Sequence, residues 1–190
     1  MTNSLGSNHL YIYSTDLAYF PDNIADFITR CRELELVGMP ASNLGDNYYL
    51  VGDKFLQWVS FLGCSPYLKT TPKNDSDTDY CSVFIPGSNQ GVRFISIPGA
   101  TPRCPECRKV ISNRSELWCK WEMGNEDKTI ECEHCHTLIK ASDLDWRKNA
   151  GIVKFSLKIS NIFPKEALPA DQLLSSLSDF TGVKWKYFYA

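Results

Sequence analysis

Two pairs of cysteines, each with two residues between its members, constrain this chain more than any other feature of its sequence. Cys104 and Cys107 form the first pair, and Cys132 and Cys135 form the second after a gap of 24 residues. A turn of this length lets both thiolates of a pair reach one metal ion, and two such turns supply four soft ligands. Thiolates favour zinc, or iron in a cluster, over magnesium or calcium. The spacing therefore predicts one four-cysteine metal site.

The predicted site is closed. A catalytic zinc keeps a position for water, whereas four cysteines fill a tetrahedral shell, so we expect one structural Zn²⁺ per chain. His134 and His136 lie beside the second pair. One of them could replace a cysteine as a metal ligand or donate a hydrogen bond to a ligand, but side chains that face solvent are the favoured interpretation. Cys119, near Trp118 and Trp121, is a fifth thiol for which packing among aromatic rings is favoured over ligation.

This segment resembles the zinc ribbon, in which two cysteine knuckles, often written C-P-x-C, lie at the tips of two β-hairpins. The resemblance covers residues 103–140, and no family is recognised for the rest of the chain. Pro105 occupies its habitual place in the first knuckle. A glycine often follows the second cysteine of such knuckles, where φ tends to be positive, but here Arg108 and His136 follow. The resemblance implies a metal site and a place in transcription or translation machinery.

The rest of the chain has the periodicity of a folded α+β protein. With 190 residues, 43% of them hydrophobic, it is long enough for one core. We expect two strand–helix–strand halves that form one antiparallel or mixed sheet with helices on it, residues 1–98 and 142–190, with the zinc ribbon inserted at 99–141. The predicted strands are 10–14, 48–51, 80–85, 92–97, 153–159 and 183–189, of which 80–85 and 92–97 pair as a hairpin.

Three helices are predicted. The first spans 24–34, with Asp22 as its N-cap and Gly38 as its terminator, and the second spans 53–62. The third spans 171–181 and ends at Gly182. The polar loop 69–79 is the expected mobile segment.

The remaining cysteines carry no motif. Cys31 is predicted in the core on the buried stripe of the first helix. Cys64 and Cys81 are also favoured as core residues, although a pocket lined by both stays open. No stretch of about 18 apolar residues and no secretory signal is visible, so we expect a cytoplasmic protein with no membrane partner.

Charge weakens the nucleic-acid function that the resemblance implies. Between positions 103 and 148, nine basic side chains are balanced by nine acidic ones, and the whole chain carries a net charge of −2. Phosphate binding needs unopposed basic residues, so nucleic acid is a possible partner but not favoured. It would need folding to gather the basic residues Arg103, Arg108, Lys109, Arg147 and Lys148 on one side.

A protein-interaction or scaffold role is the preferred prediction. Trp118, Trp121 and Trp146 could anchor an interface, or could instead cover the small core of the ribbon and dock it on the sheet. An enzyme of unrecognised type is a further alternative, with catalytic residues unknown, because no phosphate-binding, dinucleotide, zincin or nucleophile-elbow motif is present. Redox exchange at the cysteine pairs is disfavoured, because neither pair clearly opens a helix.

The acidic residues at positions 75–79 do not form a calcium-binding loop, because the residues that follow them do not fit the loop's pattern. Asp75, Asp77 and Asp79 begin like such a loop, but Tyr80 and Pro86 stand where glycine and glutamate are required. We interpret these carboxylates as a solvated acidic stretch.

Overall fold

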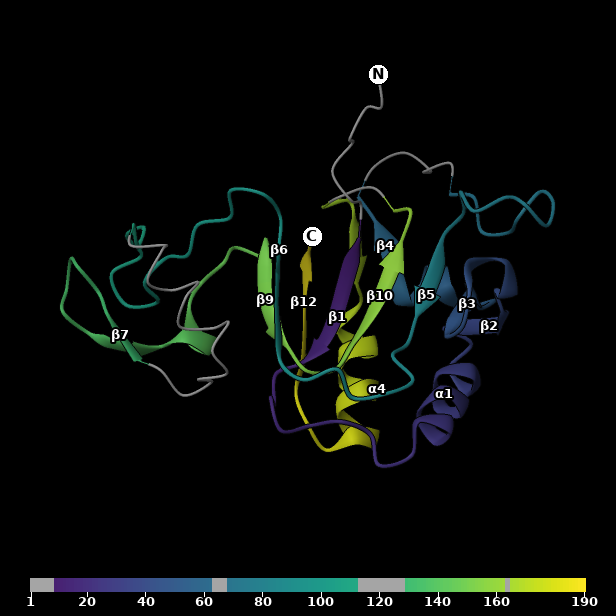
Figure 1. The fold of residues 1–190 in the computed structure, drawn as a ribbon, viewed down its shortest axis with the longest axis horizontal. Coiled ribbons are helices and arrows are strands. Elements are labelled where there is room, and N and C mark those ends of the chain that lie inside the picture. Colours follow the sequence, from purple (N-terminus) through teal and green to yellow (C-terminus); the bar gives the residue numbers. More distant parts are fainter. Residues whose placement is uncertain (1–8, 63–67, 113–128, 163–164) are drawn as a thin grey trace, which may run out of the picture.

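The computed structural model of the chain describes residues 9–62, 68–112, 129–162 and 165–190. This part is a mixed fold with three α-helices, in agreement with the predicted α+β class, but its strands form several antiparallel sheets where one sheet was predicted. Its largest sheet has six strands in the order β12-β1-β10-β5-β3-β2 (Figure 1). In chain order these strands are β1 (Leu10–Ser14), β2 (Val37–Pro40), β3 (Tyr48–Val51), β5 (Ser82–Phe84), β10 (Ser156–Ser160) and β12 (Trp185–Tyr189).

The other described strands form three pairs. These are β4 (Val59–Phe61) with β11 (Ala167–Pro169), β6 (Arg93–Ser96) with β9 (Ala150–Val153), and β7 (Thr129–Glu131) with β8 (Leu138–Lys140). The helices are α1 (Ile24–Glu33), α2 (Phe55–Trp58) and α4 (Asp171–Thr181), with short 3₁₀ turns at Ser42–Leu44 and Ala141–Asp143. None of the described helices has the length and apolar character needed to cross a membrane.

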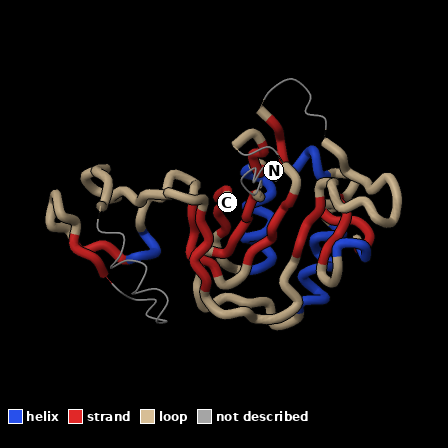
Figure 2. The backbone as a smooth tube through the Cα atoms, turned by 45° about the horizontal axis from the view of Figure 1, so that its top comes forward, coloured by secondary structure: helices blue, strands red, loops and turns tan. Residues whose placement is uncertain are grey.

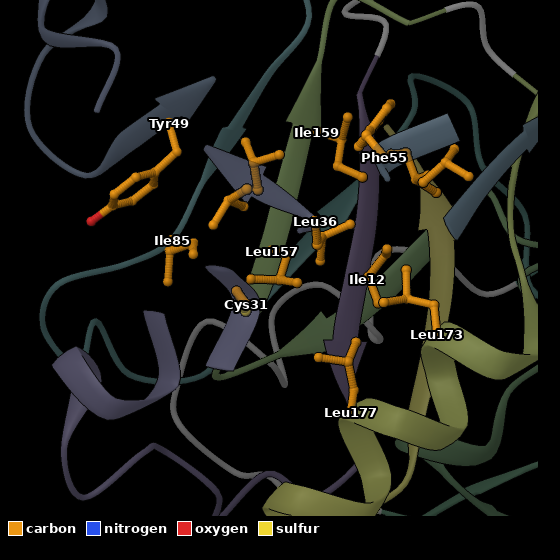
Figure 3. Packing of buried hydrophobic residues seen from close by; sticks show 14 of the residues in the cluster. Ile12, Cys31, Leu36, Tyr49, Phe55, Ile85, Leu157, Ile159, Leu173 and Leu177 are labelled. Atoms are coloured by element: carbon orange, nitrogen blue, oxygen red, sulfur yellow. The ribbon is translucent and has the colours of Figure 1, made fainter. Parts of the chain in front are cut away.

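The main core lies between one face of the six-stranded sheet and the helices α1 and α4. Alternate residues of each strand point into it, because successive side chains of a strand lie on opposite faces. Figure 3 shows Leu173 and Leu177 of α4 beside Ile12 of β1 and Leu157 of β10, and all four are fully buried. Replacing one such leucine by alanine costs about 2–5 kcal/mol. Cys31 of α1 belongs to the same cluster, which confirms its predicted core position.

Helix α1 forms as its periodicity predicts, but both of its predicted end residues are wrong. Asn23, and not Asp22, caps it, because the Asn23 side-chain oxygen accepts a hydrogen bond from the Ala25 amide at 3.0 Å. At the other end the chain leaves the helix through Glu35, which has a φ of 53°. Gly38 lies inside strand β2. A single left-handed residue therefore replaces the glycine terminator.

The predicted helix 53–62 is shorter than its apolar pattern indicates. Only Phe55–Trp58 is helical, and Val59–Phe61 forms strand β4, which pairs with Ala167–Pro169 more than a hundred positions away. One helical turn has little stability of its own, so pairing with a distant strand decides the conformation of the following residues. The buried side chain of Val59 faces the core in this arrangement.

Two strand predictions are also wrong, one in its pairing and one in its extent. Strands β5 and β6 do not form a hairpin, because β5 pairs with β10 and β3 whereas β6 pairs with β9. The strand predicted at 153–159 is divided in two, with β9 ending at Val153 and β10 beginning at Ser156. Between them Phe155 inserts into the core, where its ring lies edge-on to Phe27 at 4.9 Å.

Helix α4 matches its prediction at both ends, and Gly182 follows it with a φ of 73°. Strand β12 is shorter than predicted and begins at Trp185.

The segment with the paired cysteines extends from the β6–β9 pair. In Figures 1 and 2 its β7–β8 hairpin stands away from the six-stranded sheet. A second hydrophobic cluster holds this segment together and reaches back to Ala150 of β9 and Phe94 of β6. The division of the chain at residues 99 and 141 stays a prediction.

Candidate metal centre

The second cysteine pair lies in the turn of the β7–β8 hairpin. Glu131 and Leu138 form the last pair of that ladder, so Cys132 and Cys135 lie in the turn that joins the strands. The Cys132 amide donates to the Thr137 carbonyl at 2.9 Å, and the His136 amide donates to the Cys132 carbonyl at the same distance. These two bonds close a compact knuckle around the pair.

The first pair has the same backbone hydrogen bonds. The Cys104 amide donates to the Lys109 carbonyl, and the Arg108 amide donates to the Cys104 carbonyl, both at 2.9 Å. Antiparallel bridges from Arg103 to Val110 and to Asp145 hold this knuckle at its base. Two segments of unrelated sequence therefore fold into matching turns.

The two knuckles bring four sulfur atoms together. Cys104 Sγ lies 3.7 Å from Cys135 Sγ, and Cys107 Sγ lies 3.7 Å from Cys132 Sγ. All four sulfurs lie within 4.8 Å of one another. Four sulfurs placed 2.3 Å from a tetrahedral zinc would be about 3.8 Å apart. A disulfide would need about 2.05 Å, so the closest approaches fit shared coordination of an ion and not covalent pairing.

Burial differs among the four thiols. Cys104 and Cys132 are fully buried, Cys107 is half-buried and Cys135 is exposed. The two buried thiols are members of the second hydrophobic cluster, together with Ile111, Ile139, Leu144 and Trp146. The sulfur site is thus part of the small core of this segment.

The pKa values of two thiols reflect hydrogen bonds and crowding. Thr137 lowers the pKa of Cys135 to about 6, because its hydroxyl and its amide both stabilise the thiolate. The Lys109 amide lowers the pKa of Cys107, but desolvation and the three other sulfurs outweigh it and raise this pKa to about 11. Four thiolates in so small a space repel one another, so their joint ionisation requires a bound cation. Thr137 was not singled out by sequence reasoning, although its position two residues after the second cysteine is a usable signal.

The two histidines beside the second pair bond elsewhere. His134 Nε2 lies 3.2 Å from the Val110 carbonyl oxygen, and His136 Nδ1 lies 2.7 Å from a carboxylate oxygen of Glu131. Glu133 accepts a hydrogen bond from the Ser112 amide, which lowers the pKa of its carboxyl. His134 and Glu133 thus tie the second knuckle to the residues that follow the first one. Among the described residues, the sulfur cluster consists of the four predicted cysteines alone.

Of the other predicted site residues, some are buried and the rest lie outside the described residues. Cys81 is fully buried in the main core, and burial raises its pKa to about 12, as it does that of Cys31. Trp146 is 7% exposed and packs on Phe94 with ring centres 5.0 Å apart, so it docks the segment and does not project as an anchor. The predictions for Cys64, Cys119, Trp118 and Trp121 lie outside the described residues.

A hollow of about 710 Å³ lies between the base of the cysteine segment and the edge of the main sheet. Two of its ionisable groups, Asp145 and Lys148, bond to neighbouring parts of the chain. Asp145 accepts from the Arg147 amide at 2.8 Å, and the Lys148 ammonium donates to the Tyr187 hydroxyl while lying 4.1 Å from the centre of that ring. The enzyme alternative gains no support from these contacts. The Arg147 guanidinium also lies 4.0 Å from the Asp145 carboxylate, so two of the basic side chains that a nucleic-acid surface on this segment would need, Arg147 and Lys148, have partners within the chain.

Comparison of the chain with protein-family models, with curated proteins and with solved structures gives no match. Function is therefore inferred from geometry and chemistry alone.

Proposed function

We propose that this protein is a non-catalytic zinc-binding protein whose four-cysteine site holds a zinc-ribbon segment in its folded form. The single observation that carries this proposal is the convergence of Cys104, Cys107, Cys132 and Cys135 within 4.8 Å. Zn²⁺ fits this donor set because thiolates are soft ligands and because a d¹⁰ ion accepts a tetrahedral shell without preference.

A structural role for the ion follows from the number of ligands. Four protein sulfurs leave no position for a water molecule, which a hydrolytic zinc site requires. The two buried sulfurs also belong to the hydrophobic cluster of the segment, so binding of the ion and packing of the cluster support each other. One zinc per chain is the stoichiometry that this arrangement supports.

We place the role of the metal-held segment in protein interaction. Leu138 lies on β8, one position after the residue that closes the second knuckle, and 68% of it is exposed. An exposed leucine on a metal-braced hairpin offers a partner protein an apolar contact that needs little reordering. Trp146 drops out of the set of predicted anchors because it is buried.

Elemental analysis of the purified chain tests the proposal. We expect about one zinc per chain, lost in Cys104→Ser and in Cys135→Ser, since three thiolates bind the ion far less tightly than four. Cys81→Ala is the matched control, because it removes a thiol that lies in the main core and should keep its zinc. Circular dichroism of each variant reports whether the main sheet persists. A wild-type chain that is fully folded without metal would contradict the proposal, as would full zinc content in a Cys104→Ser, Cys135→Ser double variant.

A further inference from the structure

A row of paired residues crosses five strands of the main sheet. In register they are Phe188 of β12, Tyr11 of β1, Lys158 of β10, Phe84 of β5 and Tyr48 of β3, and each lies directly opposite the next on the neighbouring strand. We call them the aromatic–lysine row, and the strands that carry them can be followed in Figure 1. Their sequence neighbours point into the main core, so the row lies on the face opposite α1 and α4.

The rings of this row make two contacts, one on each side of the lysine. Tyr11 stacks on Phe188 with ring centres 5.1 Å apart and planes inclined by 6°. Tyr48 and Phe84 lie 4.9 Å apart. Phe188 is 1% exposed because the β6–β9 pair covers it, and Tyr11 packs against the same cluster. Tyr11, Phe84 and Tyr48 are half-buried and offer part of their surface to solvent.

Two cations lie on the same face. Lys158 Nζ is 5.4 Å from the ring centre of Tyr48 and 5.3 Å from that of Phe84. Arg93 on β6 lies near Tyr11, where its positive charge offsets part of the rise that burial causes in the tyrosine pKa. Within the described chain, the buried Nε of Arg93 has no hydrogen-bond partner. Lys158 Nζ donates a hydrogen bond to the Tyr48 hydroxyl at 3.3 Å, which holds the ammonium beside that ring. Within the described residues, no carboxylate forms an ion pair with Lys158 or Arg93, so neither positive charge is neutralised there.

We propose that the face of the aromatic–lysine row binds single-stranded nucleic acid. Bases would stack on the accessible rings of Tyr48, Phe84 and Tyr11, and phosphates would contact Lys158 and Arg93. Single strands expose the faces of their bases, and proteins that bind them combine aromatic platforms with cationic side chains on an open sheet. A duplex hides those faces, so it should bind weakly. This inference concerns the main sheet and goes beyond the proposed function, because it does not depend on the metal.

The balanced charge of the cysteine segment is not an argument against this surface. The net charge of −2 is a sum over the whole chain, whereas binding depends on the charges within reach of the ligand. Two phosphate contacts are few, so we expect modest affinity and a shallow salt dependence. For a single strand, each neutralised phosphate contributes about −0.7 to the slope of log K against log salt, which gives about −1.4 here.

Fluorescence anisotropy with labelled single strands of oligo-dT and oligo-rU tests the proposal, with a duplex of mixed sequence as the comparison. We expect the full-length protein to bind both single strands at low salt and the duplex at least about fivefold less tightly. Tyr48→Leu should weaken single-strand binding at least about fivefold through lost stacking. Lys158→Gln should weaken it and reduce the salt slope by about 0.7. Tyr48→Phe keeps the ring and should retain binding.

A second tyrosine–lysine pair supplies the matched control. Tyr187 pairs with Ile12, which points into the core, so Tyr187 lies on the other face of the sheet, and it is in cation–π contact with Lys148. Tyr187→Leu and Lys148→Gln should leave binding unchanged. Cys104→Ser, checked by circular dichroism for an intact main sheet, should also retain binding. No binding at about 50 μM protein would overturn the proposal. Binding that is lost in Cys104→Ser but kept in Tyr48→Leu would overturn it as well and would place the contact on the cysteine segment.

Discussion

Arg108 and His136 occupy the same backbone position in two different turns. Each follows the second cysteine of its pair, each donates its amide to the carbonyl of the first cysteine at 2.9 Å, and their φ angles are 61° and 59°. Glycine adopts this left-handed conformation without strain, whereas a residue with a Cβ does not. The geometry that glycine usually supplies is therefore reached here by an arginine and a histidine.

Replacing Arg108 by glycine should strengthen the metal site. The change removes left-handed strain of about 1–2 kcal/mol, part of which is offset by the greater freedom of glycine in the unfolded chain. We expect a net gain of about 0.5–1 kcal/mol, which corresponds to a two- to fivefold rise in metal affinity, measured by competition with a chelator. Lys109→Gly is the control, because Lys109 does not have a positive φ and should lose affinity. Equal losses in both variants would contradict the assignment of strain to Arg108.

Removing the metal should unfold the cysteine segment while the main sheet persists. Cys104 and Cys132 are members of the small second cluster, whereas β1 and β10 belong to the larger core under α1 and α4. Without the ion, repulsion among the thiolates and the loss of four coordinate bonds act only on the segment. Hydrogen exchange after chelation should show lost protection at the amides of Arg108 and His136 and retained protection in β1. Retained protection throughout would mean that the segment folds without metal.

Asp77 should stabilise the loop 69–79 in a way that depends on pH. Its carboxylate accepts hydrogen bonds from the Lys69 ammonium and from the amides of Lys73 and Asp79, which lower its pKa to about 2. A carboxyl with a lowered folded-state pKa contributes stability above its unfolded value of about 3.9, and this contribution disappears as pH falls toward 2. The difference in stability between wild type and Asp77→Asn should be largest at neutral pH and shrink below about pH 4.

Denaturant titrations at several pH values measure this difference. Asp75→Asn is the matched control, because Asp75 lies in the same loop and makes none of these bonds, so its effect should be small and constant with pH. A stability difference for Asp77→Asn that stays constant from pH 7 to pH 2 would contradict the assignment. Loss of metal at low pH affects both variants alike and cancels in the comparison.

Local signals predicted the parts of this protein that are locally determined. The apolar spacing in α1 and α4 and the left-handed Gly182 specify helices from neighbouring residues, and both helices form. The spacing of the cysteine pairs likewise indicated which four thiols would meet, because each pair is brought together by its own turn.

Pairing between distant strands could not be predicted in this way. Periodicity identified β5 and β6 as strands but carries no information about their partners, so the predicted hairpin was wrong. For the same reason the alternation over the predicted strand 153–159 places Lys158 on its polar face but does not identify the residues beside it. Its place between Tyr11 and Phe84 depends on the register of three strands that lie far apart in the sequence.

The junction between the β6–β9 pair and the main sheet depends on a glycine. A Cβ at Gly151 would lie 2.4 Å from Cε1 of Phe188, which is closer than carbon atoms approach without displacement. Gly151→Ala should therefore destabilise the protein by about 1–3 kcal/mol, since the ring is buried and cannot move freely. Phe188→Leu frees space at this contact. The loss of stability in the double variant should therefore be smaller than the sum of the two single losses by at least about 0.5 kcal/mol. Phe94→Leu is the matched control, because Phe94 packs on Trp146 on the other face of the pair, and its combination with Gly151→Ala should be additive. Thermal or denaturant unfolding of the wild type and the five variants measures both cycles. Equal coupling in the two cycles would show that the clash with Phe188 is not the cause.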